Sequence, residues 1–540
     1  MKDIVINIIL FFIMIIGLLL LFKKKPRSYK IVFIDKHYKK IIIVLFIIVL
    51  LTSIYKLMDI PRGIMLDEAG MYYDARLIAR YGIDRYLNKF PVYLINFDAG
   101  QSAMYAYLVA LLIKIFGSSY VLIRVPQVIF RLLSFISAYY LIKNEEDKLK
   151  RVVFMVLLTI IPYFIMQSRW GLDCNLLVHF LIISISLLVN AIYKNSNKLL
   201  VLSGLMFGLS LYTYVLSYII IPIFLISTVI YLLYIKKITI KKVIVFFIPI
   251  IILGIPLLLM ILVNNGIIDQ INSFITIPKL PFYRGGEISL LNIIPNIGIF
   301  PYLLTFCFFI YNAIPSYGTV YFISIPLVYL GLYFIFKKVR ISIKKKKLSI
   351  DTIILLLFLS VILCMLLIEE PIINKANAIY LSIIYIITVG IINIVNKNKT
   401  MLKFITILFL VNYLLFLSYY FVRYNKEYPS LPTFSPDFIE SLDYVRDIDK
   451  KTVYINPGIT QVSYIYLFLK EDIDPVILNN HLVNVEGHLY FDNNPVDVNG
   501  KTYIFDVPKN LDNDTIYITK DITNFDYQYK QIGFIYILSK

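Results

Sequence analysis

Two adjacent carboxylates, Asp67 and Glu68, begin a polar and aromatic segment that extends to about residue 120. They follow a long apolar run, 41–57, by about ten residues. A carboxylate that is partly screened from water can act as a general base toward a hydroxyl group. Adjacent acids at a helix start are equally well explained by the positive end of the helix dipole. The residue types therefore leave a catalytic and a structural interpretation open.

Two further loops carry charged residues beside apolar runs. The first contains Arg169, Trp170 and Asp173, and Trp170 is the single tryptophan of the chain. Its position is typical of an aromatic belt at a membrane interface. Charges at a helix mouth often mark a functional cavity, and a surface ion pair between Arg169 and Asp173 is an equal alternative.

The second of these loops, 369–377, contains Lys375. Its ammonium can bind a phosphate as a point charge. A lysine at the end of a span can equally extend its charge to the membrane surface. Both interpretations remain open on residue type alone.

These loops must be positioned by membrane helices. The chain has 540 residues, of which 59% are hydrophobic and 16% charged, with a mean hydropathy of +0.78. A soluble protein of this composition would expose too much apolar surface. The net charge of +19 comes from cations in short loops beside apolar runs, which favours membrane orientation over a nucleic-acid partner. Three cysteines and four histidines form no metal-binding pattern.

The basic loops predict the topology. Lysine and arginine cluster at 23–40, 143–151, 194–198, 236–242, 337–347 and 397–403. Placing all of these clusters in the cytoplasm satisfies the positive-inside rule. The twelve expected spans are 4–22, 41–57, 121–142, 152–167, 175–193, 199–214, 215–234, 243–263, 317–336, 351–368, 379–395 and 402–421. The first is expected to be a retained anchor, because its cations follow the apolar run instead of preceding it.

The segments expected outside the cytoplasm are 58–120, 168–174, 264–316, 369–378 and the tail after 421. Two apolar stretches within them, 104–116 and 293–314, would invert the later loops if each crossed the membrane. We therefore expect interfacial or re-entrant helices there. The alternative is that they form a pair of true spans.

The tail differs in composition from the rest of the chain. Residues 422–540 contain 17 Asp and Glu against 11 Lys and Arg. Ser435, Pro436 and Asp437 are typical of a capped helix start. Strand-like runs are at 452–455, 502–505, 515–519 and 532–538. The tail is therefore predicted to be a small α/β domain outside the membrane, and it shows no catalytic pattern.

Four short motifs suggest a family. They are Leu66–Ala69 with Tyr72–Ala75, Gln101–Leu108, the pair Arg169 and Asp173, and Gly208–Tyr214. In this order they resemble the GT-C glycosyltransferases, in the branch of the protein O-mannosyltransferases and the lipid A aminoarabinose transferase. The resemblance covers about 41–420 and is clearest over 60–225. It implies an all-α polytopic fold with about twelve transmembrane helices and interfacial helices in the first outer loop.

Three domains follow from the resemblance and the composition together. Residues 1–40 form an additional N-terminal anchor with a basic cytoplasmic loop. Residues 41–421 form the GT-C-like catalytic domain, and 422–540 form the extracytoplasmic α/β domain. We expect a multi-pass protein of a bacterial cell membrane, with the first outer loop and the tail outside the cytoplasm.

The resemblance also implies a reaction. The donor would be a sugar on a polyprenyl phosphate, transferred with inversion to a cell-surface acceptor, and membrane lipids would surround the chain. Asp67 corresponds to the general base, and Glu68 and Asp173 complete the acidic set. Cations that stabilise the leaving phosphate would be Arg169, Arg284 and Lys375. Further contacts with sugar or phosphate are expected from Tyr73, Gln101 and Asn377.

Two departures from the family weaken these assignments. Relatives commonly have a basic residue and paired prolines where this chain has 98–101, and often an arginine where it has Lys375. No cofactor is implied with certainty. Some distant members bind a divalent metal through their loop acids, which here would be Asp67, Glu68 and Asp173, and we predict no metal site.

The rival function is a transporter or flippase for a lipid-linked glycan. Transporters tend to contain internal repeats and charged or broken helices at the membrane midplane. This sequence shows no convincing repeat, and its charged residues cluster in outer loops. An enzyme is therefore favoured. The sugar and the acceptor, whether glycan, lipid, teichoic-type polymer or protein, are left open by the sequence.

Overall fold

The chain forms two compact units in the computed structural model. The structure describes residues 2–21, 32–97, 99–305, 311–429, 432–460, 462–485, 488–492, 494–522 and 527–540. The first unit comprises Met1–Tyr55, Gln127–Ile255 and Gly285–Tyr419. The second comprises Lys56–Pro126, Pro256–Arg284 and Tyr420–Lys540, so it joins the first predicted outer loop with the tail.

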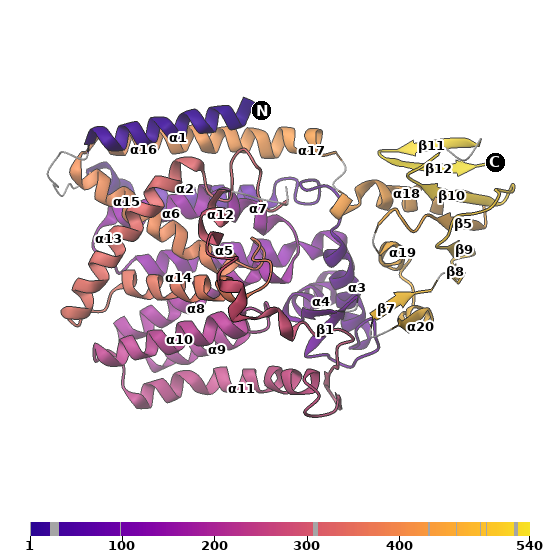
Figure 1. Ribbon diagram of the computed structural model, residues 1–540, viewed down its shortest axis with the longest axis horizontal. Helices are drawn as coiled ribbons and strands as arrows, with labels where there is room; N and C mark the ends of the chain where they lie inside the picture. The colour runs from indigo at the N-terminus through magenta and orange to yellow at the C-terminus, as the bar shows by residue number, and fades with distance from the viewer. Residues whose placement is uncertain are drawn as a thin grey trace. The chain divides into compact units, whose positions relative to one another are not determined.

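Long apolar helices dominate the first unit (Figure 1). Among the described residues, ten helices are long and apolar enough to cross a membrane. They are α1 (Lys2–Leu21), α2 (Val32–Ile54), α5 (Val125–Ile142), α8 (Asp173–Lys194), α10 (Ser217–Tyr234), α11 (Ile240–Asn264), α13 (Ile325–Lys344), α14 (Ile350–Leu367), α15 (Tyr380–Lys397) and α16 (Thr400–Ser418). The chain is a multi-pass membrane protein, and the predicted all-α polytopic class is confirmed.

The two remaining predicted spans differ from a straight helix of full length. The span expected at 152–167 is formed by α6 (Lys148–Ile160) and α7 (Pro162–Met166), which are bent by 53°. Pro162 begins α7, at a first-turn position that proline favours because its missing N–H is not needed there. The span expected at 199–214 is α9 (Asn197–Ser210), which has only 14 residues.

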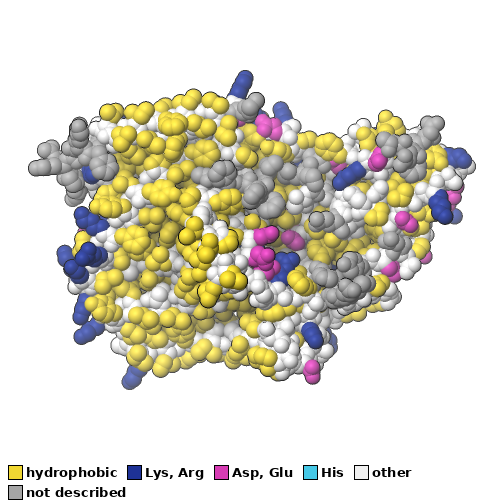
Figure 2. All heavy atoms as spheres, viewed as in Figure 1, with side chains coloured by type: hydrophobic (Ala, Val, Ile, Leu, Met, Phe, Trp, Pro, Cys, Tyr) yellow, Lys and Arg dark blue, Asp and Glu magenta, His cyan; other side chains and the backbone are white. Residues whose placement is uncertain are grey.

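The surface of the first unit separates apolar from basic regions. Figure 2 shows hydrophobic side chains over the exposed faces of the helices, as a lipid environment requires. Lysines and arginines gather at the end of the bundle that carries the loops 236–242 and 344–347 (Figures 1 and 2). The first half of the basic segment predicted at 23–40, residues 23–31, lies outside the described residues.

Helices α13 and α15 cross at very short range. A Cβ on Gly331 would overlap the carbonyl of Ile386, and one on Gly390 would overlap the carbonyl of Leu327. Small residues at such a crossing let the two backbones pack closely within a membrane. Helix α1 packs beside α16, as Figure 1 shows.

The N-terminal part of the second unit is a compact set of short elements. Helix α3 (Leu66–Tyr81) precedes a hairpin of β1 (Tyr93–Asn96) and β2 (Ala99–Ser102), followed by α4 (Met104–Phe116) and the 3-10 turn η1 (Tyr120–Ile123). Helix α4 has 13 residues, too few to cross a bilayer, which agrees with the interfacial helix expected there. The stretch 293–314, in the first unit, contains the short helix α12 (Ile299–Thr305), and 306–310 lie outside the described residues.

The tail folds as the predicted α/β domain. Its six-stranded sheet has the order β11-β12-β10-β5-β9-β8, in which β5 pairs in parallel with β10 and β9. The strands are β5 (Thr452–Ile455), β8 (Val496–Val498), β9 (Lys501–Ile504), β10 (Thr515–Thr519), β11 (Gln528–Ile532) and β12 (Ile535–Ser539). The helices are α18 (Pro436–Arg446), α19 (Ser463–Glu471) and α20 (Pro475–Asn480), and β6 (Leu482–Val485) pairs with β7 (His488–Phe491).

Three local expectations differ from the structure. The run 532–538 is not one strand, because the chain turns at Gly533 with φ 56° between β11 and β12. Ser435 adopts a left-handed conformation, and its side chain does not cap α18. Trp170 is fully buried against the ring of Tyr311, so it does not lie in an exposed aromatic belt.

Candidate active site

Glu68 fixes the start of α3. Its carboxylate accepts a hydrogen bond from the Met65 amide at 2.9 Å, and it pairs with the Arg124 guanidinium at 3.0 and 3.1 Å. Both side chains of the ion pair are fully buried. Arg124 also donates to the carbonyls of Leu57, Pro61 and Gly63. The pair therefore holds the segment that leads into α3, and both carboxylate oxygens of Glu68 are engaged.

The side-chain amide of Asn96 holds Asp67, and its two hydrogen-bond partners fix its orientation. The Nδ2 of Asn96 donates to Asp67 Oδ1 at 2.8 Å, while the Oδ1 of Asn96 accepts from Arg85 Nη2 at 3.3 Å. Arg85 in turn pairs with Asp74 through Nε at 3.0 Å and Nη2 at 2.7 Å, and both side chains are buried. Because Arg85 can only donate, it forces the carbonyl oxygen of Asn96 toward itself and the NH₂ group toward Asp67.

Gly70 makes this arrangement possible. It lies one turn after Asp67 on α3, and a Cβ there would lie 2.5 Å from Arg85 Nη2 and 2.9 Å from Asn96 Oδ1. Only glycine therefore leaves room for the guanidinium and the amide against the helix. Asp67, Gly70 and Asp74 share one face of α3, since residues three and four apart are neighbours on a helix.

The surroundings of Asp67 make it a stronger base than an exposed carboxylate. Burial raises its pKa, and the neighbouring charge of Glu68 raises it further. The hydrogen bond from Asn96 and the positive charges of Arg85 and Arg284 oppose this shift without cancelling it. Arg284, predicted from the sequence as a phosphate ligand, is thus in electrostatic range of Asp67 and has an exposed side chain.

The tail forms hydrogen bonds with the residues just before Asp67. The amide of Ile64 donates to the carbonyl of Phe434 at 2.9 Å, and the Tyr466 hydroxyl donates to the carbonyl of Ile64 at 3.1 Å. Gly63 has φ 92°, and a Cβ there would overlap the Phe434 carbonyl. The backbone that leads to Asp67 is therefore set by the tail.

Helix α3 is tied to the tail along its length. The Tyr73 hydroxyl donates to the carbonyl of Ile473 at 2.7 Å, and Tyr73 is fully buried. Arg76 donates to the carbonyls of Phe468 and Leu469 at the end of α19, both at 3.1 Å, and pairs with Asp472 at 2.9 Å. These contacts favour a positioning role for Tyr73 over direct contact with a substrate.

A cavity opens beside Leu66, the residue before Asp67. Its volume is about 340 Å³. It is lined by Leu66, Thr433, Ser435, Gly458, Ile459, Thr460, Tyr466 and Lys520. A neighbouring cavity of about 280 Å³ shares four of these residues and extends to Phe438 and Phe534. The Lys520 ammonium donates to the Ile459 carbonyl at 2.6 Å. Hydroxyl groups and one cation therefore line the space beside Leu66, together with apolar side chains.

Gln101 also belongs to the second unit. It lies in β2 opposite Leu94 and is 5% exposed. Its Oε1 has no hydrogen-bond partner among the described residues. A buried amide oxygen without a protein partner is normally satisfied by a water molecule or a ligand group.

Arg169 and Asp173 lie in the first unit and contact helix ends. The Arg169 guanidinium is fully buried and donates to the carbonyls of Thr52 at 2.7 Å, Ser53 at 3.2 Å and Tyr55 at 2.6 Å. It thereby satisfies carbonyls at the C-terminus of α2, where a cation is favoured by the dipole. Asp173 begins α8 and accepts from the Cys174 amide at 2.7 Å.

Lys375 and Asn377 also lie in the first unit. The Lys375 ammonium donates to the Glu369 carbonyl at 2.8 Å and lies 3.5 Å from Glu287. Asn377 is fully buried; it accepts from the Tyr163 hydroxyl at 2.6 Å and donates to Asn175 at 3.2 Å. The predicted residues thus fall into two groups, with Asp67, Glu68, Tyr73, Gln101 and Arg284 together in the second unit.

A divalent metal does not fit the two adjacent acids. No group of three His, Cys, Asp or Glu that could hold a metal ion occurs in the part of the chain that the structure describes. Glu68 faces Arg124 with both oxygens, so a second cation there would meet a buried positive charge. The conditional metal set of Asp67, Glu68 and Asp173 is therefore disfavoured by the contacts of Glu68.

The sequence assigned no orienting role to the residues around Asp67. Asn96, Arg85, Asp74 and Gly70 all lie in the first predicted outer loop. The one available signal was spacing, because Gly70 and Asp74 follow Asp67 by one and two helical turns. The contact of Asn96 depends on the hairpin of β1 and β2, which carries no residue-type signature of catalysis.

The comparisons with known proteins give one family match. Residues 101–264 match the family of dolichyl-phosphate-mannose-protein mannosyltransferases. None of the curated proteins matches the chain.

Three solved structures are similar at low identity. ArnT from Cupriavidus metallidurans, bound to undecaprenyl phosphate, is 9% identical over 66% of this chain, with a TM-score of 0.44. The Archaeoglobus fulgidus oligosaccharyltransferase tethered to an acceptor peptide is 12% identical over 80%, with a TM-score of 0.45. The archaeal oligosaccharyltransferase AglB from the same organism, with an inhibitory peptide and a dolichol-phosphate, is 12% identical over 81%, also at 0.45.

This chain spans 60% of the length of the first structure and 64% of the other two. The family match covers α4 to α11 and includes three of the four motifs drawn from the sequence. The resemblance to GT-C glycosyltransferases is thereby confirmed over residues 101–264.

Proposed function

We propose that the protein is a membrane glycosyltransferase that moves a sugar from a polyprenyl-phosphate carrier to a hydroxyl group of a cell-surface acceptor. The observation that carries the proposal is the Asp67 carboxylate, which is oriented by Asn96 and whose pKa is raised by burial; the preceding residue, Leu66, lines a cavity. The name of the matched family supplies the donor class, a sugar on a lipid phosphate.

The reaction would be a single displacement with inversion. The acceptor oxygen forms a bond to the anomeric carbon while the bond from that carbon to the phosphate oxygen breaks. The acceptor proton moves to Asp67, and the electron pair of the broken bond leaves with the polyprenyl phosphate. The pKa of Asp67 is raised by burial, which increases its affinity for that proton.

The remaining predicted residues divide by their contacts. Arg284 supports phosphate stabilisation best, because its side chain is exposed and it lies within electrostatic range of Asp67. Arg169 and Lys375 already bond backbone carbonyls, so a phosphate would have to compete for their donors. Glu68 and Tyr73 would position α3, while Gln101 remains a candidate ligand of the sugar. Asn377 is buried in the first unit and already bonds Tyr163 and Asn175.

The orientation proposed for the chain follows the basic loops. The basic end of the first unit would face the cytoplasm. The first outer loop and the tail would then lie on the outer face of the cytoplasmic membrane, where the acceptor hydroxyl would reach Asp67 through the cavity beside Leu66.

The decisive test is donor consumption by the Asp67→Asn variant. Membranes with wild-type or variant protein are supplied with radiolabelled polyprenyl-phosphate sugar, and released carrier is measured. We expect a fall of about 100-fold or more for Asp67→Asn at equal protein level. Asp59→Asn, an exposed acid of the same loop, is the matched control and should keep its activity. Unchanged turnover in Asp67→Asn would refute the base assignment.

A further inference from the structure

The connections of the tail sheet change direction between β5 and β10. These two strands are parallel neighbours. After β5 the chain continues to β9 on one side of the sheet, and after β10 it continues to β11 and β12 on the other side. The connections therefore leave the carboxyl ends of β5 and β10 in opposite directions. In open α/β sheets a crevice forms at such a switch point, and it is the usual place for a ligand.

The two cavities described above lie at this switch point. Both are lined by Ile459 and Thr460, which follow β5, and by Lys520, which directly follows β10. The hydrogen bond from the Lys520 ammonium to the Ile459 carbonyl, at 2.6 Å, joins the two strand ends. The cavities therefore occupy the position at which the topology of the sheet predicts a ligand. None of these three residues was assigned a role from the sequence.

The charges in the lining balance. Among the described residues that line the two cavities, Asp437 is the one acid and Lys520 the one base. Because these charges are equal and opposite, the lining gives no net attraction to a polyanion or a polycation. Thr433, Ser435 and Thr460 add hydroxyl groups, which can both donate and accept hydrogen bonds. The lining therefore favours an uncharged ligand with many hydroxyl groups.

An exposed aromatic ring accompanies the carboxylate. Phe534 lines the second cavity with 62% of its surface exposed, and its amide donates to Asp437 Oδ2 at 3.0 Å. Gly533 precedes it, and a Cβ there would overlap the same carboxylate. The C–H groups on the apolar face of a sugar ring are attracted to the negative face of an aromatic ring, and sugar hydroxyls donate to carboxylates. A sugar unit therefore matches the combination of Phe534 and Asp437.

The first cavity connects this position with the proposed base. It extends to Leu66, the residue before Asp67, and is also lined by Tyr466. Burial raises the pKa of the Tyr466 hydroxyl, and the charges of Glu68 and Asp67 raise it further. Tyr466 is thus within electrostatic range of Asp67, so a ligand that fills the cavity extends from the sheet to the start of α3.

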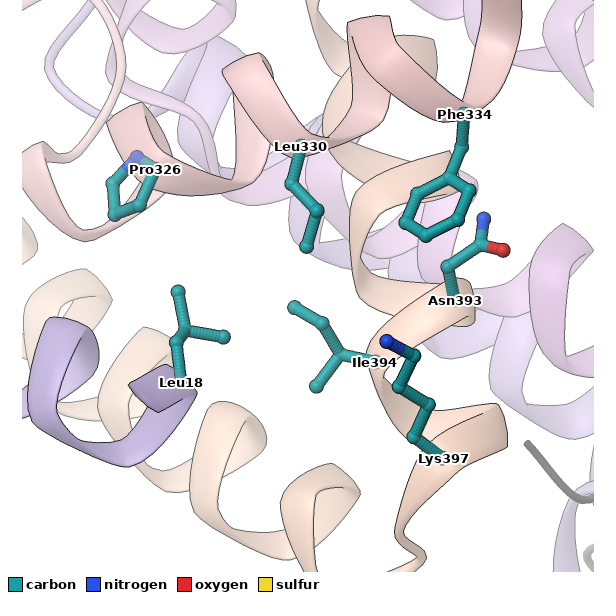
Figure 3. A pocket seen from close by; sticks show the side chains of 7 residues that line it. All are labelled: Leu18, Pro326, Leu330, Phe334, Asn393, Ile394 and Lys397. Atoms are coloured by element: carbon teal, nitrogen blue, oxygen red, sulfur yellow. The ribbon is translucent and has the colours of Figure 1, made fainter. Parts of the chain in front are cut away.

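The groove between α1, α13 and α15 on the first unit has a different lining. Its volume is about 160 Å³, and Figure 3 shows apolar side chains such as Leu18 and Phe334 together with Asn393 and Lys397. The Asn393 amide already donates to the Val389 carbonyl at 2.7 Å, and Lys397 also has a partner within the protein. The groove therefore gives no comparable argument for a polar ligand.

We infer that the tail binds a neutral glycan at the switch point of its sheet, and that this glycan is the acceptor of the transfer. One sugar unit lies against Phe534 and Asp437, and the glycan continues past Thr460 toward Leu66. The site itself belongs to the second unit alone. The role of the glycan as acceptor rests on the proposed function.

The test is oligosaccharide binding by the full chain, measured by native mass spectrometry. Mild acid releases oligosaccharides from envelopes of cells that contain the protein, and anion exchange separates a neutral from an anionic fraction. We expect the wild type to bind the neutral fraction, and to bind neither the anionic fraction nor tryptic peptides from the same envelopes. Asp437→Asn should weaken this binding roughly tenfold, because hydrogen bonds to a charged group are the stronger ones. Phe534→Ala should weaken it about fivefold.

Two further variants separate lost contacts from misfolding. Tyr529→Ala removes a ring of β11 that is similarly exposed, at 57%, but lines neither cavity, so it should bind as the wild type does. Thr460→Val keeps the shape of the side chain and removes one hydroxyl, so it should weaken binding about threefold. The inference is overturned if the wild type binds no neutral oligosaccharide, if it prefers the anionic fraction or the peptides, or if Phe534→Ala and Tyr529→Ala bind alike.

Donor consumption separates this inference from the proposed function. The same envelopes are supplied with radiolabelled polyprenyl-phosphate sugar, and the label is followed into glycan, protein and lipid. Binding of the neutral fraction without donor consumption would refute the transfer reaction and still support the glycan site. Donor consumption without such binding, or with the label recovered in protein or lipid, would refute the glycan as acceptor.

Discussion

Replacing Asn96 by alanine tests whether the orientation of Asp67 matters for catalysis. Asn96 donates to Asp67 at 2.8 Å and is itself held by Arg85 at 3.3 Å. A hydrogen bond to a charged group contributes about 1.5–3 kcal/mol. If this orientation serves the transition state, its loss lowers turnover by roughly 10- to 150-fold, since about 1.4 kcal/mol is tenfold in rate.

The same variant should change the pH dependence in a defined direction. Asp67 must be ionised to accept a proton, so activity is lost as pH falls through its pKa. The Asn96 hydrogen bond lowers that pKa against the larger effect of burial. Removing it raises the pKa further, so the acid limb of kcat/KM should move to higher pH in Asn96→Ala. A merely structural defect would lower the rate without moving this limb.

The assay is transfer from a radiolabelled polyprenyl-phosphate sugar over a range of pH. Asn494→Ala is the matched control, because Asn494 also donates an amide hydrogen to an aspartate, Asp492, at 2.6 Å, but does not contact α3. It should keep both the rate and the acid limb of the wild type. An Asn96→Ala enzyme with wild-type turnover, or with a lowered rate and an unmoved acid limb, would refute the reasoning.

Three other perturbations separate structure from chemistry. Glu68→Ala leaves the buried Arg124 unpaired, so the free energy of unfolding should fall by about 3–5 kcal/mol. If the variant instead folds fully and loses specific activity, Glu68 has a catalytic role. Burial raises the pKa of Asp84 to about 7. Stability should therefore fall as pH rises from about 4 to 7, because the folded state binds the extra proton, and Asp84→Asn should flatten this slope in thermal unfolding. Thr460→Trp should fill the cavity beside Leu66 and raise the KM for the acceptor, while donor binding, measured by filter retention, is unchanged. An equal loss of affinity for donor and acceptor would contradict the acceptor route.

Hydropathy was sufficient to predict most of the long apolar helices, while the orientation drawn from loop charge stays a prediction. The spans follow from apolar runs of membrane length, and ten of the twelve are single long helices. The exceptions have local causes, since Pro162 breaks one span and α9 is only 14 residues long. Trp170 shows the limit of such patterns, because an interfacial and a buried tryptophan look alike in a sequence.

The candidate site was predictable only in part. The sequence identified Asp67 and Arg284, which carry charge in loops predicted to face outward and interact in the second unit. The choice of Asp67 over Glu68 came from the family resemblance and not from residue type. Adjacent residues on a helix point about 100° apart, and only the fold decides which one meets Arg124. Asn96 and Gly70 were missed for a similar reason: their roles arise from hydrogen-bond geometry and from space at the helix surface.

The hydrogen bonds of the tail are the strongest reason to treat it and the first predicted outer loop as one structural unit. Its acidic sequence shows no catalytic pattern, yet both backbone groups of Ile64 bond to it, through Phe434 and Tyr466. These contacts involve backbone groups and one hydroxyl, so they cannot be predicted from the types of the residues. A shift of the tail would move the first turn of α3, and with it the hydrogen bond that orients Asp67. A domain that contributes no predicted catalytic group can therefore still determine where the proposed base lies.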